Sequence, residues 1–402
     1  MPPTVSSTSA STTRLAFAGV AFAFLVTMLG TTLPTPLYPG YQAAFGFSQL
    51  IITVIFAAYA VGVIAALLVT GRWSDQLGRR PLLFAGLAAA ALSDVVFLAA
   101  DGLSTLLVGR VLSGISAGIF TGTATVAVVE LAPEAWKRTA TFVATAANMG
   151  GLGLGPVVAG ALGEYAAWPL HLAYAVHLGL LAIAVLGVAM AAETVTRPPR
   201  VRLRIQRLKV PPEVRGVFMP AVIAGFAGFA VLGFFTATAP AFMSQVLGYS
   251  NLLAIGLVAG CVFFASTLGQ LVQGRLPEAH RLPLGCAVVI VGALLVGAGL
   301  AWATLWGFLL GALIVGLGQG IAFRAGLGAV AAACPLNQRG AVTSTFFVIV
   351  YVAISIPVVG IGLMARLVGL QATGVGFAIG VAALAGVALV SLQRQRAATA
   401  VR

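Results

Sequence analysis

Charge is what this sequence has least of. Only 8% of its 402 residues are charged, and only nine of them are Asp or Glu. A soluble globular chain carries about 25% charged residues, so the composition excludes a soluble domain. Cysteine is also scarce, and Cys261, Cys286 and Cys334 all lie in or at the ends of apolar runs. We interpret them as small buried residues, not as a disulfide framework or a metal site.

The sequence also lacks motifs that would indicate catalysis or nucleotide hydrolysis. It has no G-x-x-x-x-G-K-[ST] phosphate-binding loop, no H-E-x-x-H helix, and only three scattered histidines. We therefore predict no catalytic residues, no metal and no cofactor. A membrane-embedded enzyme is a remote alternative, because it would need a nucleophile and a base that this pattern does not supply.

Apolar residues make up 60% of the chain, with a mean hydropathy of +1.07. Runs of about 20 apolar residues, the length that crosses a bilayer, recur along the whole sequence. We predict an all-α integral membrane protein with twelve spans, surrounded by the lipid bilayer. The predicted spans are residues 15–33, 49–70, 82–100, 104–130, 139–162, 168–192, 216–238, 251–273, 283–300, 303–333, 341–364 and 370–391.

The net charge of +13 would suggest a nucleic-acid partner in a soluble chain, but its distribution gives another reason. Lys and Arg gather in alternate loops and at both termini, while the opposite loops hold only Arg366. Because basic loops stay in the cytoplasm, we predict a multi-pass protein of the cell membrane, with both termini cytoplasmic and no nucleic-acid partner.

The second half of the chain repeats the first. Arg138-Thr139-Ala140 is followed by Pro156-Val157-Val158, and Arg339-Gly340-Ala341 is followed by Pro357-Val358-Val359 at the same spacing. Parallel repeats of this kind place a substrate path between two halves. We predict two pseudo-symmetric six-helix halves, residues 14–192 and 214–392. Three further segments are predicted: a disordered N-terminus (1–13), a basic linker (193–213) and a tail (393–402). The linker would be either solvated or in contact with anionic lipid headgroups.

A charged turn separates the second and third apolar runs, with no charge in residues 51–70 or 82–93. Its glycines, Gly71 and Gly78, are expected to permit a tight turn and close helix approach. The turn resembles the G-x-x-x-D-x-x-G-R-[RK] signature of the major facilitator superfamily of secondary transporters. The resemblance implies that fold, alternating access between the halves, and a cytoplasmic gate. The implied gate residues are Gly71, Asp75, Gly78, Arg79, Arg80 and Glu130.

A second motif lies in the fifth apolar run, where residues 151–160 read GLGLGPVVAG. It resembles the G-x-x-x-G-P-x-x-G-G motif of antiporters, with Ala159 in place of one glycine. Small residues let helices approach closely, and a proline frees a backbone carbonyl and kinks its helix. We expect such contacts at Gly151, Gly155, Pro156 and Gly160. Close packing without a transport role is the alternative.

Three ionisable residues lie inside predicted spans, where an unpaired charge is costly. Asp94 and Arg110 fall at matching depths on adjacent spans, so we predict that they pair. The pair would be either a static bridge or a proton site that supplies the coupling acid absent from the first span. Arg324 is predicted to bind an anionic substrate, to snorkel toward the membrane surface, or to pair with Glu130.

The two motifs together resemble those of the 12-span drug:proton antiporters. This resemblance implies a secondary active transporter that exports small, drug-like molecules, functions as a monomer, and uses a proton gradient without a cofactor. The alternative within the superfamily is a transporter of small organic anions or metabolites, which Arg110 and Arg324 would favour.

Overall fold

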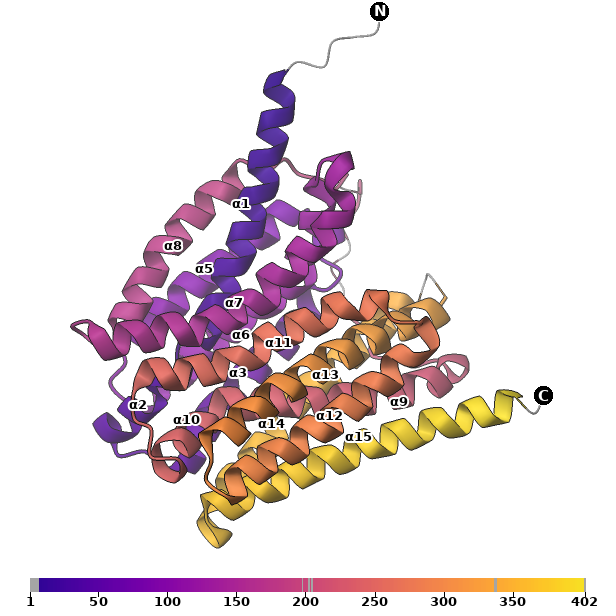
Figure 1. Cartoon of the computed structure of the whole chain (residues 1–402). Helices are drawn as coiled ribbons and strands as arrows, with labels where there is room; N and C mark the ends of the chain where they lie inside the picture. Colours follow the sequence, from indigo (N-terminus) through magenta and orange to yellow (C-terminus); the bar gives the residue numbers. More distant parts are fainter. Residues whose placement is uncertain (1–6, 197, 202, 204, 336–337, 401–402) are drawn as a thin grey trace, which may run out of the picture.

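A computed structural model describes residues 7–196, 198–201, 203, 205–335 and 338–400 (Figure 1). All regular elements among these residues are helices, and twelve of them are long and apolar enough to cross a membrane. The predicted number of spans is therefore confirmed, and each predicted span falls on one of these helices.

The long helices divide into two sets of six. In the N-terminal half they are α1 (Ser7–Thr32), α3 (Gln49–Thr70), α5 (Arg79–Leu98), α6 (Leu103–Leu131), α7 (Lys137–Tyr165) and α8 (Leu172–Ala189). In the C-terminal half they are α9 (Arg215–Ala237), α11 (Leu252–Val272), α12 (Glu278–Ala301), α13 (Leu305–Ala333), α14 (Arg339–Val368) and α15 (Leu370–Ala400). Shorter elements between them include α2 (Tyr38–Phe45), α4 (Ser74–Leu77), α10 (Ala239–Ala241) and the π-helical turn η4 (Phe242–Val246).

The two ends of the chain are more helical than expected. Helix α1 begins at Ser7, so the prediction of disorder is wrong for residues 7–13, while residues 1–6 lie outside the described part. Helix α15 continues to Ala400, through most of the segment predicted as a tail. Gln, Arg and Ala follow its last apolar turn. These residues favour the helix, and a helix that is already formed extends at little cost.

The two halves meet at one end of the molecule and diverge toward the other (Figure 1). Helix α1 starts and helix α15 ends at the diverging end, which we call the termini face. The opposite end, where α2 and α10 lie, is the distal face. In Figure 1 the indigo-to-magenta half and the orange-to-yellow half are joined along the crossing of α7 and α11.

Glycines permit the close contact between the halves. A Cβ atom added to Gly256 of α11 would collide with the carbonyl oxygen of Pro156 on α7, and one added to Gly160 would collide with the carbonyl oxygen of Leu252. Helix α14 approaches α3 in the same way, because a Cβ on Gly362 would collide with Thr53. We call these two helix pairs, α7 with α11 and α3 with α14, the distal seam.

Polar contacts close the same seam at the distal face. The backbone N–H of Leu252 donates to the carboxylate of Glu164 at 2.7 Å, which satisfies a free donor at the start of α11. Arg366 Nη2 donates to Ser48 Oγ at 2.7 Å, from the end of α14 to the residue before α3. Arg366, the one basic residue predicted on this side, thus joins the two halves.

At the termini face the basic linker crosses from one half to the other. Gln206 N donates to Leu68 O of α3 at 2.7 Å, and Lys209 N donates to Thr345 Oγ1 of α14 at 3.0 Å. A hollow of about 790 Å³ lies beside it, lined by Arg72, Ile205, Gln206, Arg207 and Ala341. The linker therefore contacts both halves at its centre instead of running free in solvent.

The geometry of the distal seam predicts a specific disulfide. A Cβ on Gly362 would touch Thr53 Oγ1 and lie 3.1 Å from Thr53 Cγ2. Because both atoms are bonded to Thr53 Cβ, the two Cβ atoms lie near the lower end of the about 3.5–4.5 Å that a disulfide spans. Thr53→Cys with Gly362→Cys, in a chain without its native cysteines, should crosslink under mild oxidation. The crosslink is measured by electrophoresis after proteolytic cleavage of the linker. Thr53→Cys with Gly360→Cys is the control, since nothing lies within 4 Å of a Cβ on Gly360. Equal crosslinking of the two pairs would contradict a closed seam.

Candidate functional site

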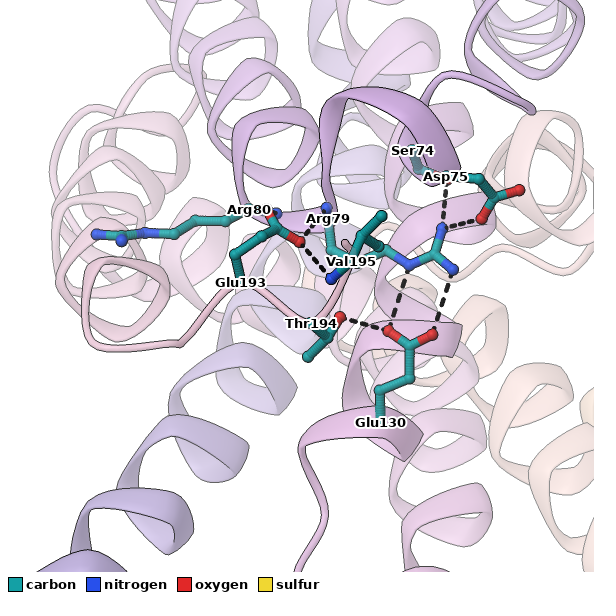
Figure 2. Close-up of polar contacts among 8 residues, drawn as sticks. All are labelled: Ser74, Asp75, Arg79, Arg80, Glu130, Glu193, Thr194 and Val195. Atoms are coloured by element: carbon teal, nitrogen blue, oxygen red, sulfur yellow. Dashed lines mark hydrogen bonds and ion pairs between the residues drawn. The ribbon is translucent and has the colours of Figure 1, made fainter. Parts of the chain in front are cut away.

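The charged turn between α3 and α5 folds around the guanidinium of Arg79, the first residue of α5. Arg79 Nη1 donates to Asp75 Oδ1 at 2.6 Å and to Ser74 Oγ at 2.7 Å. Its Nη2 and Nε donate to the two carboxylate oxygens of Glu130, at the end of α6, at 3.2 and 3.3 Å (Figure 2). The structure thus brings together Asp75, Arg79 and Glu130, three of the residues that the resemblance implied.

Two residues at the start of the linker complete this cluster, and sequence reasoning missed both. The Glu193 carboxylate accepts from the backbone N–H of Arg79 at 2.8 Å and of Arg80 at 3.2 Å. These are free donors at the start of α5, where a negative charge is favoured. Thr194 Oγ1 donates to Glu130 Oε2 at 2.5 Å (Figure 2). The sequence feature that could have indicated Glu193 is its position just after the sixth apolar run, on the same predicted side of the membrane as the charged turn.

Of the two glycines in the turn, Gly78 is the one that the backbone requires. It has φ = +107°, and a Cβ there would collide with the Glu193 carboxylate. Gly71 has φ = −56°, which any residue adopts, but a Cβ there would collide with the carbonyl oxygen of Leu67, so this position favours glycine for lack of space and not for its backbone angle. Gly78 therefore both sets the start of α5 and leaves room for Glu193.

Arg80 points away from the acidic residues of the cluster. Its Nη2 donates to the carbonyl oxygen of Ala189 at 2.7 Å, at the end of α8, where a cation is favoured. Its guanidinium carbon lies 5.7 Å from the ring centroid of Phe84. Arg80 thus ties the turn to α8, whereas Arg79 ties it to α6.

The glycine motif of α7 serves two interfaces. Added Cβ atoms on Gly151 and Gly155 would collide with the backbone of α1, whereas Gly160 faces the other half across the distal seam. Pro156 removes the donor that would bond to the carbonyl of Leu152, and Thr32 Oγ1 of α1 donates to that oxygen at 2.9 Å. The predicted close contacts and the freed carbonyl are all present.

The predicted pair between Asp94 and Arg110 is wrong. Asp94 Oδ2 lies 2.6 Å from His177 Nδ1 of α8. Arg110 Nη1 donates to Thr31 O of α1 at 2.7 Å, and none of the carboxylates in the described ranges forms an ion pair with it. Depth alone did not set the partner. Ser93 Oγ donates to Gly109 O at 2.8 Å, so α5 contacts α6 at Gly109. Arg110 is the next residue of α6, and its side chain is rotated by about 100° around the helix axis from that contact.

Aromatic rings of α3 surround the guanidinium of Arg110 instead. Its carbon lies 4.7 Å from the centroid of Tyr59 and 5.4 Å from that of Phe56, and the side chain is fully buried. Tyr351 of α14 lies close to Tyr59 from the other half. Cation–π contact and one carbonyl therefore replace the carboxylate that the sequence predicted, and Arg110 Nε has no hydrogen-bond partner among the described residues.

His177 is the third residue that sequence reasoning missed. It lies a little more than one turn from the distal end of α8, as Asp94 does on α5. Asp94 lies in the third predicted span and His177 in the sixth. A comparison of the depths of polar residues in these two spans, like the one made for the third and fourth, would have paired them.

Arg324 lies partly buried in α13. It forms no hydrogen bond or ion pair within the part of the chain that the structure describes, and Glu130 is bound to Arg79 and Thr194 instead. The predicted pairing with Glu130 is therefore wrong. Binding of an anion and snorkelling stay as predictions.

Comparison with known sequences decides the family. The profile of the Major Facilitator Superfamily matches residues 20–358. The chain belongs to this superfamily.

Candidate multidrug resistance proteins named MdtD are similar to this chain. The MdtD of Salmonella typhi is 28% identical over 242 residues, 60% of this chain and 47% of the relative. The MdtD of Enterobacter sp. (strain 638) is 27% identical over 192 residues, 48% of this chain and 39% of the relative. The chain thus matches about half the length of these relatives or less.

Solved structures share the fold at low sequence identity. One is a bacterial homolog of the human lysosomal transporter Spinster, with a TM-score of 0.75 and 14% identity, covering 95% of this chain and 98% of that one. Another is the human organic anion transporter MFSD10, with a TM-score of 0.66 and 20% identity, covering 94% and 99% of the two chains. The predicted fold of two six-helix halves is confirmed.

The backbone at Gly78 predicts the effect of a single methyl group. Gly78→Ala should destabilise the folded protein by about 1–3 kcal/mol, because a residue with a side chain is strained at this φ, and should displace Glu193. The measurement is thermal unfolding of the purified protein. Gly274→Ala, in the turn between α11 and α12, has open space around its Cβ and should leave the melting temperature unchanged. Equal melting temperatures for both variants would show that Gly78 is not required.

The α7 motif predicts that size at one position controls transport. Gly155→Leu should overpack the contact with Leu29 and Thr32 of α1, at a cost of about 1–3 kcal/mol, and abolish transport. Ala159→Gly moves toward the antiporter pattern and should retain transport. Transport is measured in vesicles with matched amounts of inserted protein. Normal transport by Gly155→Leu would show that this contact is dispensable.

Proposed function

We propose that this chain is a secondary transporter that moves small molecules across the cell membrane by alternating access. The observation that carries the proposal is the asymmetry between the two faces. Glycine contacts and hydrogen bonds join the helices of the two halves at the distal face, whereas the halves diverge at the termini face beside a hollow of about 790 Å³. One closed and one open end is the arrangement that alternating access requires.

Orientation follows from charge. Because the basic turns, the start of α1 and the end of α15 lie at the termini face, the positive-inside rule favours placing that face in the cytoplasm. The state described above is then closed to the outside and open to the cytoplasm. In the opposite state, the turn at Asp75 closes toward the start of α14. Support comes from the Asp75 side chain, which is 64% exposed and held by Arg79, and so remains available to a second partner at a helix start.

The proposed cargo is a small, drug-like molecule, neutral or cationic, that is exported in exchange for protons by a monomer. Support for this cargo comes from the relatives named for multidrug resistance and from an aromatic cluster in the C-terminal half. Phe323 of α13 lies 5.1 Å from Phe229 of α9, with Tyr351 a further neighbour of Phe229 at 6.1 Å. A proton gradient is the proposed energy source, so no bound cofactor takes part.

Transport of small organic anions is the second proposal. It is favoured by Arg110, a buried guanidinium with no carboxylate partner among the described residues, and by Arg324, which has no polar partner there either. The solved structure of an organic anion transporter with the same fold adds support. A carboxylate substrate would supply the charge that these side chains lack.

Transport in inverted membrane vesicles tests these proposals. A pH-gradient probe is followed while tetraphenylphosphonium, chloramphenicol or benzoate is added. Export coupled to protons predicts partial collapse of the gradient by the cation or the neutral antibiotic, and little effect of benzoate. Collapse of the gradient by benzoate, with little effect of the other two compounds, would favour the anion proposal. Vesicles that contain Gly155→Leu at the same protein level serve as the control. No response to any compound beyond that of the control would refute proton-coupled transport of these three classes.

A further inference from the structure

Asp94 and His177 form a buried pair that no gate or seam contact uses. Their exposed fractions are 3% and 1%. His177 Nδ1 lies 2.6 Å from Asp94 Oδ2, and its Nε2 lies 2.9 Å from the carbonyl oxygen of Val26 on α1. A backbone carbonyl only accepts hydrogen bonds, so Nε2 must carry a hydrogen. This contact therefore fixes the hydrogen on one of the two imidazole nitrogens of His177.

The remaining contact can hold one proton. With Nε2 protonated, the short contact is made either by a neutral imidazole and a carboxylic acid or by an imidazolium and a carboxylate. Both arrangements contain the same number of protons and have zero net charge. Removing that proton leaves two acceptors facing each other and a net negative charge in an apolar interior, both of which are costly. Loss of the proton must therefore be coupled to a rearrangement or to the arrival of a cation.

A small cavity adjoins the pair. Its volume is about 10 Å³, close to the minimum for one water molecule. The hydroxyl of Thr27, which lines it, is buried and has no hydrogen-bond partner among the described residues, so a water would find a partner there as well as at Asp94.

Few other ionisable groups face the pair from the helices packed around it. Tyr174 lies one turn away on α8, and its hydroxyl is 3.1 Å from that of Tyr41 on α2. Tyr38 lies near both. Helix α6 contributes Arg110, which is bound to Thr31 O of α1, and the described stretches of α1 and α5 beside the pair add no further charge. None of these groups forms an ion pair with Asp94 or His177, so the protonation of the pair sets the net charge of this buried region.

We propose that Asp94 and His177, with one water molecule in this cavity, form the proton-binding site of the transporter. The proposal rests on the proton-coupled transport proposed above and names the residues that hold the coupled proton. Helix α1 links this site to the path between the halves, because its carbonyl groups bind His177 at Val26 and Arg110 at Thr31. Deprotonation favours a cationic substrate beside α1, and protonation favours its release.

Proton release on substrate binding tests the assignment. Purified full-length protein in weakly buffered detergent is mixed with tetraphenylphosphonium. A pH indicator measures protons, and calorimetry measures binding. The wild type should release about one proton per bound cation, because the pair holds one exchangeable proton. Asp94→Asn keeps a donor toward Nδ1 but has no proton to release, so it should bind the cation and release at least about tenfold less. Release equal to that of the wild type would overturn the proposal.

A second pair of variants guards against a misfolded Asp94→Asn. A Cβ on Gly30 would collide with the imidazole of His177, whereas a Cβ on Gly179 of α8 would meet nothing within 4 Å. Gly30→Ala should lose proton release, and Gly179→Ala should retain it. Retained release in Gly30→Ala would overturn the proposal.

Nitrogen-15 NMR of the wild type provides a readout that is independent of transport. His177, identified by the signal lost in His177→Gln, should show a hydrogen on Nε2 at every pH and a titrating proton at Nδ1. An Nε2 without hydrogen would overturn the proposed site. Failure of proton-coupled transport itself would appear differently, as wild-type vesicles that respond to none of the three compounds while the NMR titration is intact.

Discussion

Inside an apolar bundle, each buried charge and each freed carbonyl must find its partner within the protein, because lipid supplies none. In the N-terminal half this requirement converges on α1. Its carbonyl groups at Val26 and Thr31 bind His177 and Arg110, and the hydroxyl of Thr32 satisfies the carbonyl that Pro156 frees on α7. A helix without an acidic residue thus organises the buried polar groups of its neighbours through backbone and hydroxyl atoms.

Much of the architecture could be predicted because it depends on local patterns. Twelve apolar runs correspond to twelve long helices, and the motif resemblance singled out Asp75, Arg79 and Glu130, which are in contact in the structure. The contacts of Gly155 and Gly160 followed from size alone. The partner of Asp94 did not follow, because depth along a span leaves rotation about the helix axis undetermined, and Arg110 faces α1 and α3 instead.

Glu193 and Thr194 illustrate a different limit. Both act on the charged turn from more than 100 residues away in sequence, through backbone donors at the start of α5 and through Glu130. Their positions depend on how the end of α8 lies against that turn, which no local pattern records.

The internal repeat is kept only in part in the second half. Ile356, which stands at the position equivalent to Gly155, is 65% exposed and makes no such close helix contact. Sequence symmetry therefore indicates shared fold more reliably than shared contacts.

The position of the close contact between α7 and α11 has a mechanical consequence. The contact is centred near Pro156, about nineteen residues from the start of α7 at the termini face and about nine from its end at the distal face. At 1.5 Å per residue these are lever arms of roughly 28 and 14 Å. A rotation of one half about this pivot would displace the termini face about twice as far as the distal face. The mouth at the termini face would therefore open wider than the one at the distal face for the same angle of motion.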